Sequence, residues 1–189
     1  MPASSTQMAL AASSSADVLL IDSEPTAANL APTLRSSYRV VVSPSVATAR
    51  AFLGRNGWTV VVIDLDLPDG AVFDLCREAK ALPKPPSVLV TTAQVERVPD
   101  ALAAGCDGVL LKPFAPHLLV ARIGRLVRSR TQNSGKPHSM LPGTNRRWPN
   151  IGCPYCETQG VTSFEFASHR RAWYACLRCK NVWLHKRQE

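Results

Sequence analysis

Five short apolar runs, rich in valine, leucine and isoleucine, constrain the fold most strongly. They occupy residues 18–21, 39–42, 59–63, 87–91 and 108–111. Segments of helical length, rich in alanine and leucine, separate them. Strands that alternate with helices form βαβ units on a parallel sheet with both faces covered. The chain is therefore predicted to contain a doubly wound α/β domain over residues 17–130.

Polar side chains stand at the ends of four of these runs. Asp22 follows the first run, Asp64 closes the third, Thr92 ends the fourth, and Lys112 follows the fifth. Ligands of open parallel sheets bind at the carboxyl ends of the strands. Two carboxylates, a hydroxyl and an ammonium group at one edge indicate a site for a metal ion and a phosphoryl group.

Four segments together resemble the receiver domain of two-component response regulators, the CheY-like superfamily. They are IDSEP at 21–25, DLDLPDG at 64–70, TA at 92–93 and GCDGVLLKPF at 105–114. Their order and approximate spacing match that family across residues 17–130. The resemblance implies a flavodoxin-like fold of five parallel strands in the order 2-1-3-4-5.

The same resemblance implies a role for each residue of the site. Asp64 would accept a phosphoryl group from a histidine kinase or a phosphotransfer protein, which gives an aspartyl phosphate. Asp22, Asp64 and the backbone carbonyl of Asp66 would hold Mg²⁺. Lys112 and the Thr92 hydroxyl would contact the phosphate, where positioning and charge neutralisation carry most of the catalysis.

Two positions depart from the family pattern. Ser23 stands where the family usually has a second acidic residue next to Asp22, which removes one negative charge from the Mg²⁺ site. Glu24 is the candidate that would replace it, because alternation along an extended segment puts it on the side of Asp22. Val109 stands where the family commonly has a tyrosine or phenylalanine that moves on phosphorylation. Coupling between the site and a distant surface is therefore expected to be weak or differently built.

The C-terminal part of the chain contains two CxxC motifs with the spacing of a zinc site. The cysteines are Cys153, Cys156, Cys176 and Cys179. Each turn directs two thiolates at one point, so that two turns complete a tetrahedron around Zn²⁺. A closed four-sulfur site leaves no position for a substrate, which makes this zinc structural. So short a segment buries too little apolar area to fold unaided, and zinc would supply much of its folding energy.

This C-terminal segment resembles a zinc ribbon. Trp173, Tyr174, Val182 and Trp183 are expected to form the core of its β-hairpin. The two cysteines outside the motifs, Cys76 and Cys106, fall within the α/β pattern and are expected to be small core residues.

Charge is spread unevenly and supports a division into modules. Residues 1–120 carry 9 Lys and Arg against 11 Asp and Glu, a net −2, whereas residues 121–189 carry 13 against 3, a net +10. We expect a disordered N-terminus at 1–16, the receiver domain at 17–130, a flexible basic linker at 131–150 and the ribbon at 151–189. No stretch approaches the apolar length of a membrane span, and the protein is expected to be cytoplasmic.

These observations predict a signalling protein and no enzyme: a response regulator whose phosphorylation on Asp64 controls the zinc ribbon. One alternative is a pseudo-receiver that never carries phosphate and serves as a protein-interaction adaptor. A second is a nucleic-acid-binding regulator whose receiver serves for dimerisation as a homodimer. Its basic side chains could neutralise phosphates. They are Arg146, Arg147, Arg170, Arg171, Arg178, Lys180, Lys186 and Arg187.

Overall fold

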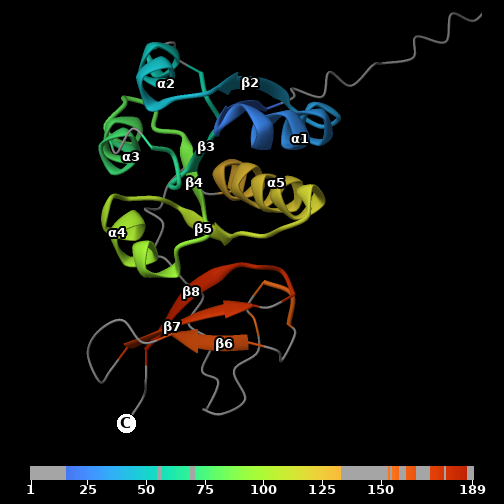
Figure 1. Cartoon of the computed structure of the whole chain (residues 1–189), viewed down its shortest axis with the longest axis vertical. Helices are drawn as coiled ribbons and strands as arrows, with labels where there is room; N and C mark the ends of the chain where they lie inside the picture. The colour runs from blue at the N-terminus through green and yellow to red at the C-terminus, as the bar shows by residue number, and fades with distance from the viewer. Residues whose placement is uncertain are drawn as a thin grey trace, which may run out of the picture.

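The protein is built from two β-sheets that lie next to each other (Figure 1). The computed structural model describes residues 16–54, 57–68, 71–132, 153, 155–157, 161–164, 171–176 and 178–186. The expected disordered N-terminus lies outside these residues except for Ala16. The expected linker also lies outside them, except that the last helix continues to Gln132.

The larger sheet has five parallel strands in the order β2-β1-β3-β4-β5, which confirms the predicted topology. The strands are β1 (Asp17–Ile21), β2 (Arg39–Ser43), β3 (Val60–Asp64), β4 (Ser87–Thr92) and β5 (Gly108–Leu111). Every residue of β3 and β4 is buried, as expected for strands covered on both faces. This burial explains why their sequences are continuous apolar runs rather than alternating ones.

Helices cover both faces of this sheet. They are α1 (Glu24–Arg35), α2 (Val46–Leu53), α3 (Val72–Lys80), α4 (Val98–Ala103) and α5 (Pro116–Gln132), with a short 3-10 turn η1 (Val95–Arg97) before α4. Figure 1 shows α1 and α5 on one face and α2, α3 and α4 on the other. Each face has its own hydrophobic cluster. Both Cys76 and Cys106 are buried in the cluster on the α2–α4 side, which confirms their prediction as core residues.

The smaller sheet is antiparallel and has the order β6-β7-β8. Its strands are β6 (Val161–Phe164), β7 (Arg171–Cys176) and β8 (Val182–Lys186). The expected hairpin is β7–β8, and the prediction was incomplete because β6 pairs with β7 as a third strand. Inside this module the Tyr174 ring stacks on Trp183 at 5.7 Å between centroids, and Tyr155 meets Trp183 edge-on at 6.3 Å. The side chain of Trp173 lies outside the described residues.

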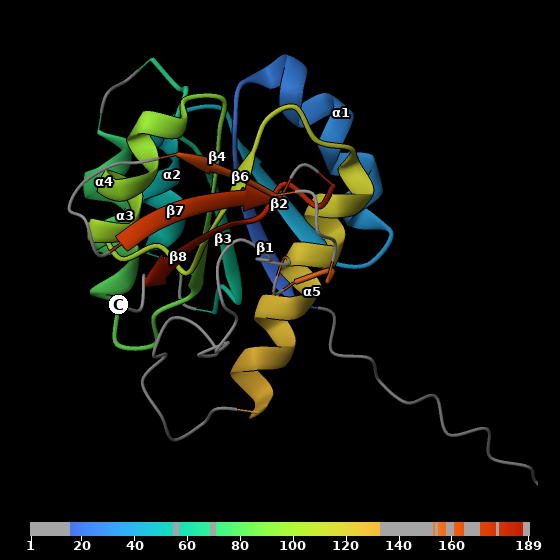
Figure 2. The same ribbon diagram turned by 90° about the horizontal axis from the view of Figure 1, so that it is seen from below.

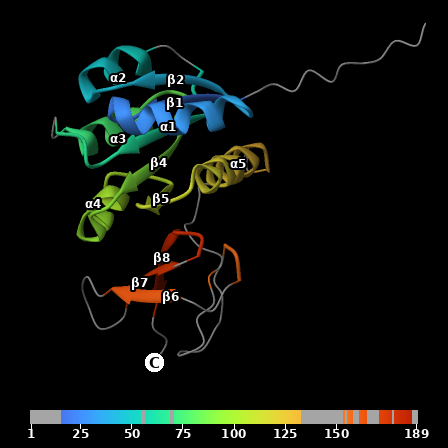
Figure 3. The same cartoon turned by 45° about the vertical axis from the view of Figure 1, so that its right-hand side comes forward.

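The two sheets meet at β5, the edge strand of the larger one (Figures 1 and 3). Leu110 forms an antiparallel bridge with Asn181, and the Leu111 N–H donates to the Lys180 carbonyl at 3.1 Å. Val182 was expected in the core of the small module, but it packs into the hydrophobic cluster of the larger domain. Figure 2 shows the small sheet in front of the large one, between α4 and α5. Among the described residues no helix is both long and apolar enough to cross a membrane.

Candidate functional site

The structure brings the four predicted strand-end residues to one edge of the sheet. Asp22 directly follows β1, Asp64 ends β3, Thr92 ends β4 and Lys112 directly follows β5. Strands β1 and β3 are neighbours in register, with Ile21 opposite Ile63, so the next residue of each strand is a buried carboxylate. Asp22 is 1% and Asp64 4% exposed. Parallel topology thus converts separate sequence positions into one site.

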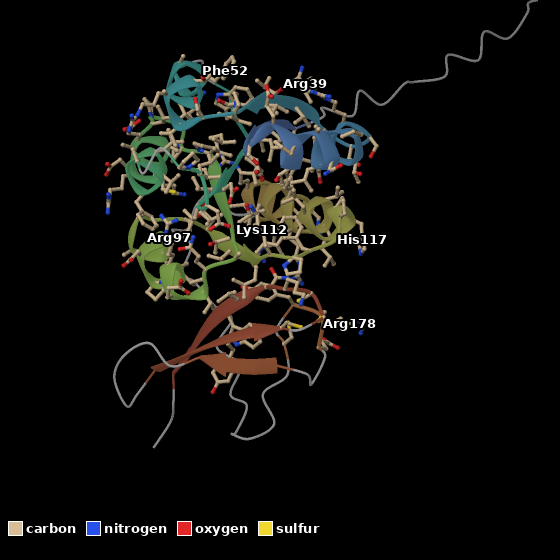
Figure 4. All side chains as sticks on the ribbon, viewed as in Figure 1. Arg39, Phe52, Arg97, Lys112, His117 and Arg178 are labelled. Carbon is tan, nitrogen blue, oxygen red and sulfur yellow. The ribbon has the colours of Figure 1, made fainter. Side chains whose placement is uncertain are left out.

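Both carboxylate oxygens of Asp64 have a partner. The Lys112 ammonium lies 2.8 Å from Asp64 Oδ2, and the Asp66 N–H donates to Asp64 Oδ1 at 3.0 Å. The Lys112 N–H in turn donates to the Thr92 carbonyl at 2.8 Å, which fixes the start of the Lys112 side chain against β4. Figure 4 shows Lys112 beside the sheet, inside the domain. Because it is largely buried, the ion pair is screened little by solvent.

The carboxyl group of Asp22 has a different environment. Burial, followed by the nearby charge of Asp64, raises the pKa of Asp22 from 3.8 to about 7, although Lys112 acts in the opposite direction. Among the described residues its Oδ2 atom has no hydrogen-bond partner. Two buried carboxylates, one with an unpartnered oxygen, fit the oxygen ligands that Mg²⁺ prefers.

Ser23 and Glu24 lie next to this carboxyl pair. The Ser23 hydroxyl lies 3.4 Å from Asp22 Oδ1 and 3.2 Å from Thr26 Oγ1. Glu24 is the first residue of α1 and is exposed. The expectation that it lies on the side of Asp22 assumed an extended segment, and that segment ends at Ser23. A metal-binding role for Glu24 stays a prediction.

The side chain of Asp66 collects donors from the loop after β4, which the sequence did not reveal. Its Oδ1 atom accepts from the Thr92 hydroxyl and from Gln94 Nε2, both at 3.0 Å. Its Oδ2 atom accepts from the Ala93 N–H at 2.9 Å and lies 3.7 Å from Lys112 Nζ. The carboxylate of Asp66 therefore faces the residues expected to contact phosphate. The only sequence signal for Gln94 is its position two residues after Thr92.

Arg97 is a second residue that the sequence did not indicate. From η1 it donates to the Leu65 carbonyl, and its guanidinium lies 5.0 Å from the centre of the Phe73 ring. These contacts tie the segment after Asp64 to the beginning of α3 (Figure 4 labels Arg97). Val109 is buried in the core, and the expected effect of its small side chain on coupling stays a prediction.

The four predicted cysteines also come together. Their sulfur atoms all lie within 4.8 Å of one another, with Cys153 and Cys179 at 3.5 Å and Cys156 and Cys176 at 3.6 Å. A tetrahedron with Zn–S bonds of about 2.3 Å has sulfur–sulfur edges of about 3.8 Å, so this cluster fits a Zn²⁺ ion. The arrangement can hold a metal in a closed site.

Backbone N–H groups around the cluster favour thiolates, whereas burial opposes them. Backbone N–H groups point at two of the sulfurs, from Tyr155 to Cys153 and from Cys179 to Cys176, each at 3.4 Å. Burial raises the pKa of the Cys153 and Cys176 thiols, an effect that a bound cation reverses. Most of the basic residues that suggested nucleic-acid binding lie outside the described side chains, and that interpretation stays a prediction.

Comparison with known families identifies the part of the chain that forms the doubly wound sheet. The family model described as "Response regulator receiver domain" matches residues 18–124. The chain belongs to this receiver-domain family.

Named relatives share the same part of the chain. The Transcriptional regulatory protein CutR of Streptomyces coelicolor is 37% identical over 116 residues, which cover 59% of this chain and 53% of CutR. The Sensory transduction protein RegX3 of Mycolicibacterium smegmatis is 30% identical over 120 residues, covering 61% of this chain and 52% of RegX3. The chain thus spans about half the length of the curated relatives it matches.

Solved structures give the same picture of the fold. The BeF3-activated receiver domain of DrrB has a TM-score of 0.54 and 25% identity, and the match covers 60% of this chain and 98% of that one. A putative response regulator from Chloroflexus aurantiacus has a TM-score of 0.55 and 27% identity, with coverage of 60% and 98%.

Proposed function

We propose that Asp64 accepts a phosphoryl group from the phosphohistidine of a histidine kinase or phosphotransfer protein. The observation that carries this proposal is the position of Asp64 beside Lys112, at 2.8 Å, with the buried Asp22 carboxyl group at the end of the adjacent strand. Asp22, Asp64 and the Asp66 carbonyl would hold Mg²⁺. When bound, Mg²⁺ neutralises negative charge on the phosphoryl oxygens.

In the transfer, an Asp64 oxygen forms the new bond to phosphorus while the bond from phosphorus to the histidine nitrogen breaks. The Lys112 ammonium offsets the charge that gathers on the transferring oxygens. To donate to the phosphoryl group, the Thr92 hydroxyl has to leave the Asp66 carboxylate that it contacts at 3.0 Å. Asp66 therefore competes with the phosphoryl group for Thr92.

The output module of this response regulator is, in our proposal, the C-terminal zinc ribbon. The closeness of its four sulfur atoms supports Zn²⁺ as a structural ion, and the β7–β8 pair supplies a scaffold for the second CxxC turn. Zinc analysis of the purified full-length chain should find one Zn²⁺ per molecule, and replacement of Cys179 by serine should remove it.

Mass spectrometry tests the phosphoacceptor directly. Incubation of the chain with acetyl phosphate and Mg²⁺ should add about 80 Da, the mass of one phosphoryl group. Asp64→Asn should abolish the adduct, and Asp74→Asn, an exposed aspartate on α3, should leave it unchanged. An adduct that survives Asp64→Asn contradicts the proposal.

A second candidate function is a phosphorylation-independent adaptor. The neutral Ser23 beside Asp22 and the engagement of Thr92 by Asp66 favour it, because both work against a bound phosphoryl group. Ser23→Asp distinguishes the two candidates. If the carboxylate site operates, restoring the second acid should tighten Mg²⁺ binding about tenfold or more. Absence of an adduct in both the wild type and Ser23→Asp supports the adaptor.

A further inference from the structure

The second CxxC turn of the ribbon pairs with β5, the edge strand of the large sheet. The backbone carbonyl of Lys180 accepts a hydrogen bond from the Leu111 N–H at 3.1 Å, and Asn181 forms an antiparallel β-bridge with Leu110. Asn181 is 7% exposed and Val182, the next residue, is 5% exposed within the core of the larger domain. The ribbon is thus held by backbone hydrogen bonding and by apolar burial at the same place.

The residues that make this contact also shape the cysteine centre. Cys176 donates its N–H to the Asn181 carbonyl and accepts one from Lys180, both at 2.9 Å. The Asn181 side-chain amide lies 3.1 Å from Cys179 Sγ. Asn181 therefore contacts β5 through its backbone and a cysteine sulfur through its side chain, so a change at either end reaches the other.

Helix α5 contacts the first CxxC turn. The guanidinium carbons of Arg122 and Arg125 lie 4.6 and 5.1 Å from the centre of the Tyr155 ring, and the Tyr155 N–H points at Cys153 Sγ. Arg122 is 6% exposed, and its Nε atom has no hydrogen-bond partner among the described residues. A divalent ion with four thiolates has a formal charge of −2, which two neighbouring guanidinium groups complement.

The same carboxyl end of β5 leads to the phosphoacceptor. Leu111, whose N–H binds the ribbon, is followed directly by Lys112, which contacts Asp64 at 2.8 Å. The N–H groups of these two residues go in opposite directions, to Lys180 in the ribbon and to Thr92 in β4. Two consecutive peptide units therefore connect the carboxylate site with the second cysteine turn.

We propose that the β5 edge, together with Arg122 and Arg125, is a docking surface for the metal-loaded form of the chain's own ribbon, and that metal binding at the cysteines is coupled to phosphoryl acceptance at Asp64. The proposal rests on the proposed function of both sites. A phosphoryl group on Asp64 lengthens the anion that Lys112 must reach. The resulting shift of Lys112 moves the preceding residue, Leu111, and weakens the hydrogen bond from the Leu111 N–H to the Lys180 carbonyl. By reciprocity, phosphorylation then lowers zinc affinity by the same factor by which zinc opposes phosphorylation.

Hydrogen exchange of the Leu111 amide in the full-length chain tests the docking. With Zn²⁺ bound, the Lys180 carbonyl protects this amide; removal of Zn²⁺ with a chelator should accelerate its exchange at least tenfold, while the Val90 amide in buried β4 stays protected. Unchanged Leu111 exchange after complete zinc removal would overturn the proposal.

Zinc competition with a chromophoric chelator tests the coupling. Beryllium fluoride with Mg²⁺, as a phosphoryl mimic, should weaken zinc binding about fivefold. Arg125→Gln should reduce that factor, whereas Arg128→Gln, on the same helix but near Tyr38, should keep it. Arg122→Gln and Asn181→Ala provide a second pair for which reduced coupling is expected.

The outcomes distinguish three claims: the zinc ribbon, the phosphoacceptor and the coupling between them. A chain that binds no zinc contradicts the ribbon itself, and a chain without a phosphoryl adduct contradicts the phosphoacceptor. A chain that binds zinc and forms the adduct, but has the same zinc affinity with and without beryllium fluoride, contradicts only the coupling.

Discussion

The carboxyl group of Asp22 is buried at the carboxyl edge of the sheet, next to Asp64. Its pKa is raised from 3.8 to about 7 by burial and by Asp64. The folded protein thus binds a proton that the unfolded chain releases at lower pH. Stability linked to the protonated form is complete below pH 3.8 and is lost as the pH rises through about 7.

Asp22→Asn should therefore stabilise the metal-free protein in a pH-dependent manner. At about pH 8 the free energy of unfolding should rise by about 2 kcal/mol, and near pH 4 it should change little. Urea denaturation at the two pH values measures this difference. The same variant should bind Mg²⁺ far more weakly, because it lacks one carboxylate ligand. A stability gain that is equal at both pH values would contradict the burial argument.

A second prediction concerns Asp66, whose carboxylate accepts hydrogen bonds from Thr92, Ala93 and Gln94. Asp66→Ala should speed adduct formation with acetyl phosphate about tenfold, because it frees the Thr92 hydroxyl and removes a negative charge near the incoming phosphoryl group. Time-resolved intact-mass measurements give the rate. In a Thr92→Val background the gain should shrink, since the freed hydroxyl is absent. A slower reaction in Asp66→Ala would show that Asp66 assists transfer.

Site residues could be predicted from the sequence where they stand at the end of a predicted strand. Four side chains end or follow an apolar run: Asp22, Asp64, Thr92 and Lys112. The parallel arrangement of the strands then places all four at the same edge of the sheet. The donors from Ala93 and Gln94 to Asp66 were not predictable in this way, because they depend on the path of one loop. A backbone N–H in particular has no sequence signature.

Among the elements, the cysteines of the two CxxC turns differ from those of the large domain in their neighbours, because the four ribbon sulfurs lie within 4.8 Å of one another. Cys76 is buried in α3, and burial raises the pKa of its thiol to about 12. Cys106 is 2% exposed, and burial also raises its pKa. Since the thiolate is the reactive form, neither residue should react with an alkylating agent in the folded protein.

The sites at which the native protein is alkylated should therefore depend on whether Zn²⁺ is bound. With Zn²⁺ bound, iodoacetamide should modify none of the six cysteines quickly, and after chelation it should modify the four of the ribbon. Peptide mass mapping identifies the sites. Modification of Cys76 or Cys106 at the rate of the ribbon cysteines would show that zinc removal also opens the large domain.

Secondary structure was predictable to different degrees in the two modules. The strands of the large sheet are recognised from their apolar runs, which are continuous in β3 and β4 because both faces of these strands are buried. Strand β6 was missed because Val161–Phe164 is short and mixed in character, and its pairing with β7 is decided by the fold of the whole module.

At the scale of the whole molecule, the contact between ribbon and receiver is the feature that the sequence could not supply. It consists of one backbone hydrogen bond and one β-bridge at β5, the apolar side chain of Val182, and two arginines of α5. Val182 shows the difficulty: its apolar character predicts burial, but not which of the two cores contains it. The observed core is that of the large domain, although Val182 lies beyond the family match at 18–124.

Val182→Ala should consequently destabilise the receiver. Truncation of a buried valine leaves a cavity and should lower the free energy of receiver unfolding by about 1–2 kcal/mol. The matched control is Val41→Ala, because Val41 is 36% exposed on β2 and should change stability by less than about 0.5 kcal/mol.

Pulse alkylation of Cys76 across a urea series reports opening of the receiver core specifically, since that side chain is fully buried in it. If Val182→Ala and Val41→Ala have the same midpoint, the ribbon contributes nothing to the receiver core. A lower midpoint for Val182→Ala alone makes receiver stability depend on the docked ribbon, and chelation of zinc should then lower the wild-type midpoint as well.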